Sequence, residues 1–519
     1  MRQIDVAIVG GGLAGNLLAR QLRLEAPELS VALFERSRER AYKVGESTVE
    51  IAANYLTRRL RLSTYLYKEH LPKFGLRYFF DRPDLGAPLP GMSEVGSFSA
   101  PIYPSFQLDR ARFEADLLAW NEADGVEVHV GSRVKEVTLG APHTFVAVDD
   151  GAAVPFQARW LIDCTGREGL LAKQLGLRVP EPSHRVAAAW GRFAGVTDID
   201  GLDEPAFHAR AHHSSRVLST IHFMYDGYWA WLIPLRQGLT SVGLVAEASR
   251  WAPSRHTVDG LLAELRRHRA LRELLEDVEA VALAAFTQLA FRTERFFSPD
   301  RWAVIGDAAA FVDPFYSPGS DFIALENDLV ADLVCRDVTG EAIEERALAY
   351  DRYVQYRFDT AMAVYDGLYG AFGSYGLFRA KVYFDTAVYY ALLFDSYARD
   401  EHRDLRWVRS ELRRRTYGLA LMAEVKDLFV RAAAELRRTG RYHADNLGEH
   451  DLDAFRVFGI LTDIGAPRSR RERNERTEAL FRETQLRVAA ALGDGSDLGR
   501  ALRDRPRPLF DAWSQLAAP

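Results

Sequence analysis

The stretch that decides the fold is IDVAIVGGGLAGNLLARQL, residues 4–22. It opens with a continuous apolar run, passes through three glycines in G-x-G-x-x-G spacing, and continues as an amphipathic helix. Gly10 permits a tight turn, Gly12 lets a pyrophosphate approach the backbone, and Gly15 lets the helix pack closely on the sheet. The stretch therefore predicts a strand, turn and helix that bind a dinucleotide, with the helix N-terminus facing the phosphates.

A second apolar strand strengthens this prediction. VALFER, residues 31–36, carries Glu35 twenty residues after Gly15. A carboxylate at this place accepts hydrogen bonds from a ribose hydroxyl. A lone glycine fingerprint is weak evidence, but strand, turn, helix, strand and acid in register predict a nucleotide site.

A later stretch indicates which dinucleotide is bound. RWAVIGDAAAFVDPFYSPGSDFIALENDLVADLV, residues 301–334, is an apolar strand that reaches Asp307 and then a helix entered through Pro318, Gly319 and Ser320. An acid at the end of such a strand can bind the hydroxyls of a ribityl chain, which FAD carries and NAD lacks. The start of the helix would direct free N–H groups at the pyrimidine edge of the flavin. On its own the pattern also fits a plain strand-to-helix turn.

Composition excludes several other classes of protein. The chain has 519 residues, 48% of them hydrophobic, with 66 Lys and Arg against 72 Asp and Glu. This balance is typical of a globular protein and gives no basis for nucleic-acid binding. No apolar run is long enough for a membrane span, and the first strand begins too early for a signal peptide, so we expect a cytoplasmic protein. The two cysteines are too few for a disulfide framework or a zinc site, and we expect no metal.

Two tryptophans stand one residue apart in YWAWLIPL, residues 228–235. In a strand, Trp229 and Trp231 lie on the same face, where they either fill a core or wall one side of a cavity. Residue type alone favours core packing, because large aromatic side chains dominate cores.

Four motifs together carry a family resemblance. They are GGGLAG at 10–15, VGEST at 44–48, GDAAAFVDP at 306–314 and the W-x-W-x-I-P pattern at 229–234. This combination resembles the flavin-dependent halogenases, relatives of the aromatic hydroxylases with the para-hydroxybenzoate hydroxylase fold. The resemblance covers roughly residues 4–335, and no family motif is identified in the C-terminal third.

The resemblance implies a chemistry and an α/β fold. A separate flavin reductase would supply reduced FAD, oxygen would form a C4a-hydroperoxide, and halide would attack it to give hypohalous acid. In the family, the two tryptophans are thought to keep the organic substrate away from the flavin. The fold would be a Rossmann-like FAD-binding domain with an inserted antiparallel substrate-binding sheet and a C-terminal helical region. The expected segments are 1–75, 107–185 and 295–340 for the FAD domain, 76–106 and 186–294 for the substrate sheet and lid, and 341–519 for the mainly helical region.

The chain departs from the family at the catalytic lysine. In tryptophan-type members this lysine follows the glycine of the G-E-x-T stretch by nine residues, which is Asn54 here. Phenol- and pyrrole-type members place it about a turn later, where this chain has Arg58 and Arg59. A guanidinium stays protonated and does not readily form a haloamine. Halogenation, if it occurs, is therefore not expected to use a lysine on this helix, and Lys43 is either its substitute or a solvated loop residue.

A second departure concerns the halide and the substrate. The residues aligned with the family's chloride-binding backbone are Tyr316, Ser317, Pro318 and Gly319. Because proline has no N–H, one halide donor is missing. Tyr316 also replaces the glutamate thought to assist proton removal from tryptophan, which argues against tryptophan as the substrate.

The predicted site residues follow from these motifs. The catalytic candidates are Lys43, Trp229, Trp231 and Tyr316. The cofactor-binding candidates are Gly10, Gly12, Gly15, Glu35, Arg36, Glu46, Ser47, Arg110, Asp307, Pro314, Gly319 and Ser320. Arg110 opens a helix that resembles the D-R-x-x-F-D helix of these flavoproteins, with Asp109 as its cap.

The sequence therefore predicts an FAD-dependent oxygenase acting on an electron-rich aromatic substrate, either free or tethered to a carrier protein. The missing lysine and Pro318 favour hydroxylation or another oxidation slightly, while the tryptophan motif favours halogenation of a phenol- or pyrrole-like substrate. A flavin reductase or dehydrogenase is a more remote alternative. The expected partners are a flavin reductase, the aromatic substrate and, in the halogenation case, halide, with no nucleic acid.

Overall fold

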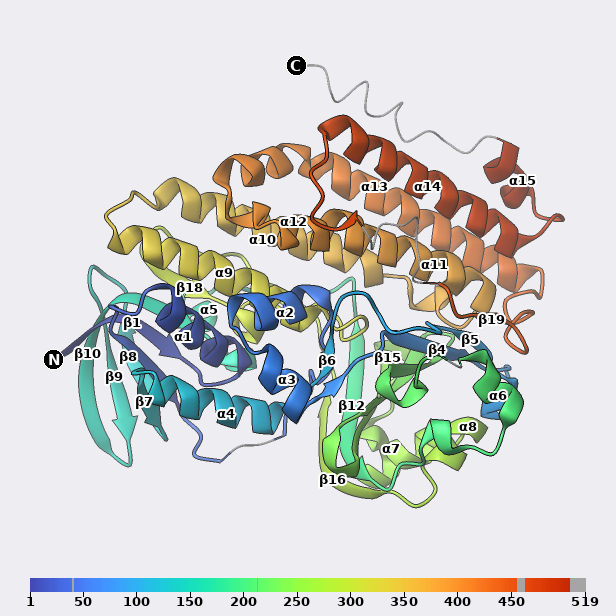
Figure 1. Ribbon diagram of the computed structural model, residues 1–519, viewed down its shortest axis with the longest axis horizontal. Coiled ribbons are helices and arrows are strands. Elements are labelled where there is room, and N and C mark those ends of the chain that lie inside the picture. The colour runs from blue at the N-terminus through green and yellow to red at the C-terminus, as the bar shows by residue number, and fades with distance from the viewer. Residues whose placement is uncertain (40–41, 212, 455–462, 505–519) are drawn as a thin grey trace.

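The computed structural model describes residues 1–39, 42–211, 213–454 and 463–504. Two sheets lie side by side beneath a layer of long C-terminal helices (Figure 1). The stretches 455–462 and 505–519 of the expected helical region lie outside the described residues.

The first sheet is built around the glycine-loop strand. Its order is β7-β2-β1-β10-β9-β8, with β18 beside β10, and β1, β2, β7, β10 and β18 run parallel. Parallel strands covered on both faces are continuous apolar runs, as in β1 and β2. The strands are β1 (Arg2–Val9), β2 (Val31–Glu35), β7 (Glu127–Val130), β8 (Arg133–Thr138), β9 (His143–Asp149), β10 (Ala152–Asp163) and β18 (Trp302–Val304).

Helices cover this sheet and carry the predicted cofactor residues. α1 (Leu13–Glu25) joins β1 to β2 and contacts both α4 (Arg110–Ala123) and α9 (Pro318–Val338). The predicted strand, turn and helix of the glycine fingerprint, and the later strand and helix at β18 and α9, are present in the structure.

The second sheet has the order β16-β12-β15-β14-β13-β4-β5-β19. Most of its pairs are antiparallel, as expected, but β4 and β13 pair in parallel, and so do β5 and β19. These partners come from distant parts of the chain, so no hairpin fixes an antiparallel arrangement. The strands are β4 (Leu76–Phe80), β5 (Ser93–Val95), β12 (Val186–Ala194), β13 (Thr220–Tyr225), β14 (Tyr228–Pro234), β15 (Leu239–Glu247), β16 (Glu279–Phe286) and β19 (His450–Asp451). Short helices lie on this sheet or beside the first, namely α3 (Ser63–Glu69), α5 (Leu170–Gln174), α6 (Pro205–Arg210), α7 (Val258–Leu265) and α8 (Arg269–Leu274).

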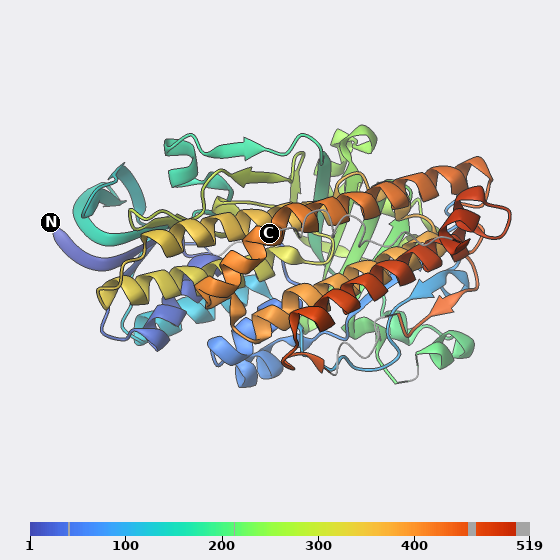
Figure 2. The same cartoon turned by 90° about the horizontal axis from the view of Figure 1, so that it is seen from above.

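The described part of the C-terminal region is mainly helical, contains the strand β19, and lies across both sheets (Figure 2). In it α10 contacts α13, and α11 contacts α14. None of the helices in the described residues is long and apolar enough to cross a membrane. The helices are α10 (Glu344–Tyr365), α11 (Tyr375–Val388), α12 (Asp395–Ala398), α13 (Leu405–Arg438), α14 (Arg470–Leu492) and α15 (Asp497–Asp504).

Candidate active site

The glycine fingerprint at the start of α1 has no space for a side chain at two of its three spaced positions. Gly10 has a φ of +112°, and a Cβ on it would lie 2.2 Å from the carbonyl oxygen of Cys164. A Cβ on Gly15 would lie 2.0 Å from the carbonyl oxygen of Gly10. The loop is therefore held tightly between β10 and α1, as the fingerprint predicts.

Gly12 faces open space, with a lysine amine at its edge. The nearest atom to a Cβ built on Gly12 is Nζ of Lys43, at 3.7 Å. The same Nζ donates a hydrogen bond to Oε2 of Glu114 on α4, at 2.7 Å. Lys43 thus lies beside the loop that would receive the pyrophosphate, and it does not line the large cavity described below.

Glu35 stands at the end of β2, next to the glycine loop. Its Oε2 accepts a hydrogen bond from the backbone N–H of Gly11 at 2.8 Å, and Oε1 accepts one from that of Ser37 at 2.8 Å. Each carboxylate oxygen keeps acceptor capacity for a ribose hydroxyl. Arg36 points elsewhere and forms an ion pair with Glu168.

Arg110 and Glu46 fix the VGEST loop. Arg110 opens α4, directly after the cap predicted at Asp109, and donates a hydrogen bond from Nη1 to the carbonyl oxygen of Val44 at 2.9 Å. Burial raises the pKa of the Glu46 carboxyl, while the guanidinium of Arg192 lies 3.5 Å from it. Arg110 thus joins the loop to α4, and Arg192 joins it to β12.

Asp307 follows β18 at the place where polyol hydroxyls are expected. Burial raises the pKa of its carboxyl, and the positive charges of Arg167, Arg110 and Lys43 partly offset this rise. A partly buried carboxyl with three positive charges nearby fits the acceptor role predicted for this residue.

The loop before α9 has an unusual backbone. Tyr316 and Ser317 have φ values of +65° and +57°, the left-handed region that costs a non-glycine residue about 1–3 kcal/mol. The N–H of Ser317 donates to the carbonyl oxygen of Pro314 at 3.0 Å, and the hydroxyl of Tyr316 donates to Oδ2 of Asp385 at 2.8 Å. These bonds hold the strained turn in place.

The first turn of α9 is open. Ser317, at its N-cap, makes no side-chain cap, and a Cβ on Gly319 would meet no atom within 4 Å. The hydroxyl of Ser320 lies 3.5 Å from the carbonyl oxygen of Ser317. Backbone N–H groups at this end are therefore available to a ligand, except at Pro318, which has none.

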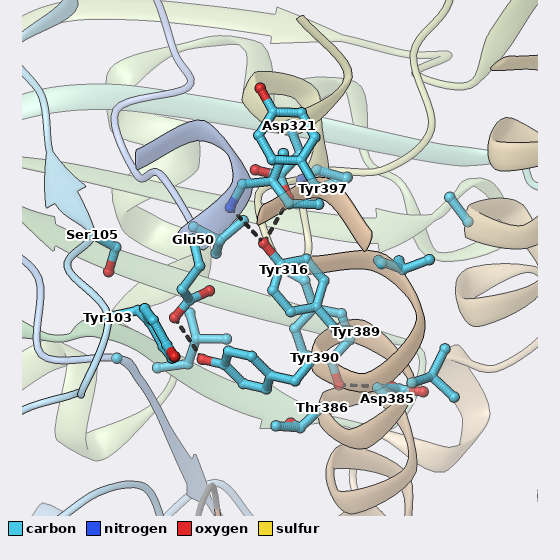
Figure 3. Close-up of a pocket in the computed structure, with 18 of the residues that line it drawn as sticks. Glu50, Tyr103, Ser105, Tyr316, Asp321, Asp385, Thr386, Tyr389, Tyr390 and Tyr397 are labelled. Atoms are coloured by element: carbon cyan, nitrogen blue, oxygen red, sulfur yellow. Dashed lines mark hydrogen bonds between the residues drawn. The ribbon is translucent and has the colours of Figure 1, made fainter. Parts of the chain in front are cut away.

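A cavity of about 490 Å³ lies between the first sheet's helices and the C-terminal region (Figure 3). It adjoins the predicted flavin-facing residues, because Val49 directly follows VGEST and Pro318 opens α9. Its volume is typical of a small-molecule site. Seven tyrosines line it: Tyr103, Tyr316, Tyr353, Tyr365, Tyr389, Tyr390 and Tyr397.

Lys73 is the lysine that lines this cavity among the described residues. It is 2% exposed, and its Nζ donates hydrogen bonds to Oγ of Ser47 and to the carbonyl oxygen of Thr48, each at 2.8 Å. Burial lowers the pKa of its amine to about 8, although the charges of Glu50 and Asp321 oppose that shift. A lysine with a pKa near the pH of reaction is suited to proton transfer.

The two tryptophans of β14 are core residues. Trp229 and Trp231 are 2% and 3% exposed, and neither lines the cavity. Nε1 of Trp229 donates to the hydroxyl of Tyr369 at 3.0 Å, and its ring packs against Phe315 at a centroid distance of 5.0 Å. Phe315 lies between Trp229 and Tyr316, which lines the cavity. The tryptophans therefore pack behind the residues that line the cavity.

The residues that occupy the family's lysine positions bind other protein groups. Arg59 donates to Oδ1 of Asp328 at 2.9 Å, and Arg58 and Arg59 both pair with Asp400. Asn54 ends α2 (Glu50–Asn54) and does not line the cavity. The two arginines therefore connect the N-terminal helices to the C-terminal region.

The fold and the glycine loop define a flavoprotein oxidoreductase. The chain belongs to the tryptophan halogenase family, whose model matches residues 88–364, more than half of its length. It is an FAD-dependent enzyme of the flavin-dependent halogenase type, and its family supports halogenation more than generic hydroxylation.

Individual relatives agree with this assignment. The chain is 28% identical over 434 residues to the flavin-dependent halogenase chlA of Dictyostelium discoideum, covering 77% of this chain and 71% of chlA. It is 27% identical over 352 residues to a 1H-pyrrole-2-carbonyl-[peptidyl-carrier protein] chlorinase of Pseudomonas fluorescens, covering 63% and 74% of the two chains. The structure of halogenase PltM in complex with phloroglucinol and FAD has a TM-score of 0.66 at 17% identity, covering 99% of this chain and 97% of that chain. At that identity the match concerns the fold.

The residues present fit FAD. The open space at Gly12, with Lys43 at its edge, suits a pyrophosphate, and Glu35 has acceptor capacity for a ribose. Asp307 and the open start of α9 would hold the ribityl chain and the pyrimidine edge, respectively.

Sequence reasoning missed Lys73. The sequence analysis placed the candidate lysine positions on the helix after Gly45, whereas Lys73 lies beyond α3, directly after β3 (Leu71–Pro72). A signal was available, because the chain has only seven lysines. Lys73 is followed by Phe74 and Gly75 and then by an apolar strand, which predicts a buried position rather than a surface loop.

Proposed function

We propose that this enzyme halogenates an electron-rich aromatic substrate, and that Lys73 handles the oxidised halogen. The single observation that supports this role is the position of Lys73: its amine is buried, lines the cavity, and is bound to the VGEST loop. Reduced FAD and oxygen supply the oxidising equivalent that converts halide to hypohalous acid.

The amine of Lys73 has a donor left for a ligand. A lysine ammonium has three N–H donors, and two of them are used by Ser47 and Thr48. The third can hydrogen-bond the oxygen of hypohalous acid, which makes the halogen more electrophilic. Because burial lowers the pKa of this amine to about 8, it also gives up a proton easily. Lys43 is less suited, because it lies at the glycine loop and is paired with Glu114.

The cavity favours a phenol- or pyrrole-type substrate. Its tyrosine rings offer faces and edges against which an aromatic ring packs, and their hydroxyls orient polar substituents. The relative from Pseudomonas fluorescens acts on a pyrrole carried by a peptidyl carrier protein. A tethered substrate is therefore included in the test below, beside free phenols and pyrroles.

Product mass spectrometry tests this proposal. Wild type, Lys73→Met and Lys68→Met are supplied with reduced FAD, oxygen and bromide, together with phenols, pyrroles and a carrier-bound pyrrole. Lys68 is the matched control, since its side chain is 77% exposed on α3. We expect brominated product from wild type and Lys68→Met, and none from Lys73→Met, with FAD binding unchanged in all three. Brominated product from Lys73→Met at the wild-type rate would refute the role of Lys73.

Hydroxylation without halide is the second candidate. Pro318 favours it, because the missing N–H weakens a halide site at the start of α9. Addition of one oxygen atom makes the product about 16 mass units heavier than the substrate. Such a product, formed equally with and without bromide, would support hydroxylation.

A further inference from the structure

We propose that Asp321 accepts the proton that the aromatic ring loses as the carbon–halogen bond forms. This role rests on the proposed halogenation. It places the base on α9, five residues after Tyr316.

Asp321 lines the cavity and is held rigidly. Its side chain is at the first turn of α9 and is 9% exposed. Oδ1 accepts a hydrogen bond from the backbone N–H of Ala52 at 2.8 Å, and Oδ2 accepts one from the hydroxyl of Tyr389 at 2.9 Å. Each oxygen keeps a second lone pair, so the carboxylate can still receive a proton from a bound substrate.

A local change in helix type brings two tyrosines to this place. α11 runs into a π-helix at Tyr389–Phe394, a form that is frequent at functional sites. The hydroxyl of Tyr389 contacts Asp321, and that of Tyr390 donates to Oε1 of Glu50 at 2.6 Å (Figure 3). Two consecutive residues therefore contact two different carboxylates of the same cavity.

The surroundings adjust the basicity of Asp321. The pKa of its carboxyl is raised to about 7, mainly by burial and to a smaller extent by the charge of Glu50. The bonds from Ala52 and Tyr389 and the charge of Lys73 act in the opposite direction. A carboxyl with a pKa near neutrality is partly ionised at the pH of reaction and holds a proton well once it has received one.

Other acids of the cavity are less suited. Asp385 is already bound by Lys381 and by the hydroxyl of Tyr316. The hydroxyl of Tyr316 donates a hydrogen bond to Asp385, and burial raises the pKa of this hydroxyl far above the usual value, so it stays protonated and does not act as a base. The carboxyl of Glu50 is positioned by one hydrogen bond, from Tyr390, whereas two hydrogen bonds position that of Asp321.

The step balances with hypohalous acid as the oxidant. The ring carbon forms a bond to the halogen while the halogen–oxygen bond breaks, and the oxygen leaves as water with a proton from the Lys73 ammonium. The ring proton passes to the Asp321 carboxylate, and a later transfer through solvent returns a proton to Lys73. The sum is an aromatic C–H and hypohalous acid giving a carbon–halogen bond and water.

Asp321→Asn tests this role, because asparagine has nearly the same shape but cannot accept the proton. We expect the ratio of halogenated product to total oxidised halogen, with the excess trapped by taurine, to fall about 10²-fold. Ring-deuterated substrate should then show a primary isotope effect that wild type lacks. FAD binding and the thermal unfolding midpoint report whether the variant is folded.

Two further variants report on the titration of the same group. Glu50→Gln removes a neighbouring negative charge and should move the acidic limb of the pH–rate profile to lower pH. Tyr389→Phe removes a stabilising hydrogen bond and should move the same limb to higher pH. An unchanged product ratio in Asp321→Asn, with no isotope effect, would overturn the proposal. An acidic limb at the wild-type pH in both Glu50→Gln and Tyr389→Phe would also overturn it. Failure of the halogenase assignment is distinguishable, since wild type itself would then give no halide-dependent product.

Discussion

The amine nitrogen of Lys73 lies 2.8 Å from the hydroxyl oxygen of Ser47, 26 residues earlier in the chain. Two short α-helices, a π-helical segment and a strand separate the two residues, and the chain returns so that the lysine contacts the loop expected beside the flavin. The hydroxyl of Ser47 also bonds that of Thr220 on β13, at 2.9 Å. Lys73 thus stands where the VGEST loop, the second sheet and the cavity meet.

Product formation should fall as the pH rises above about 8. Burial lowers the pKa of Lys73 from 10.5 to about 8, so the ammonium is present below that pH and lost above it. Lys73→Arg keeps the positive charge at all these pH values, but its planar group does not fit the same donors. We expect that variant to lose about 10²-fold in rate and to lack the basic limb. The pH–rate profiles of both enzymes provide the measurement, and an unchanged basic limb in Lys73→Arg would contradict this assignment.

Gly12→Val should remove FAD binding without unfolding the protein. The nearest atom to a Cβ on Gly12 is 3.7 Å away, so the apoprotein accepts the side chain, but the pyrophosphate then meets it. Gly10→Ala is the contrasting variant, because its Cβ would meet backbone at 2.2 Å and should destabilise the fold itself. The flavin absorbance after purification and the unfolding midpoint distinguish the two effects. Retention of FAD by Gly12→Val would exclude this loop as the cofactor site.

Lys43→Ala should weaken FAD binding and spare catalysis. The amine lies beside Gly12 and is 46% exposed, so it contributes a screened charge to the phosphate end of the site. We expect a higher dissociation constant for FAD that rises further with salt, and a normal product yield once FAD is saturating. Loss of product at saturating FAD would instead make Lys43 a catalytic residue.

Trp231→Ala should destabilise the second sheet. Its indole covers Gly243 on β15, where a Cβ would lie 2.2 Å from the ring, and Nε1 donates to the hydroxyl of Ser241 at 3.2 Å. Removing a buried indole typically costs about 3–5 kcal/mol. Denaturant unfolding should show this loss. A variant as stable as wild type, but with a weakened affinity for substrate, would mean that the tryptophan forms the cavity wall after all.

The local patterns of the sequence predicted the strands, the glycine turn and the helices expected to hold the cofactor. Gly10, Gly15 and Glu35 lie within one strand-turn-helix-strand unit, so their spacing alone implies their geometry. The capping of α4 by Asp109 was also predictable, because it involves residues next to each other. The parallel pairing of β4 with β13 was not, since nothing local specifies which distant strand becomes a neighbour.

The arrangement of the residues that line the cavity depends on contacts between segments distant in the chain. Asp321 and Tyr389 lie 68 residues apart, and their contact requires a π-helix that periodicity does not reveal. Arg58 and Arg59 lie at positions where the sequence predicts the family lysine or a substitute for it. Their partners Asp328 and Asp400 are distant in the chain, so the sequence does not reveal these ion pairs. The tryptophans were correctly expected on one face of a strand, but the burial of that face behind Phe315 is a tertiary property.

The halide dependence of product formation tests the account most directly. Wild-type enzyme with reduced FAD, oxygen and a phenol or pyrrole substrate is assayed by mass spectrometry in buffer with bromide and in buffer freed of all halide. If the enzyme is a halogenase, the assay with bromide gives a brominated product and the assay without halide gives no oxidised substrate. Turnover that is unchanged by complete removal of halide would contradict it and assign the enzyme to hydroxylation.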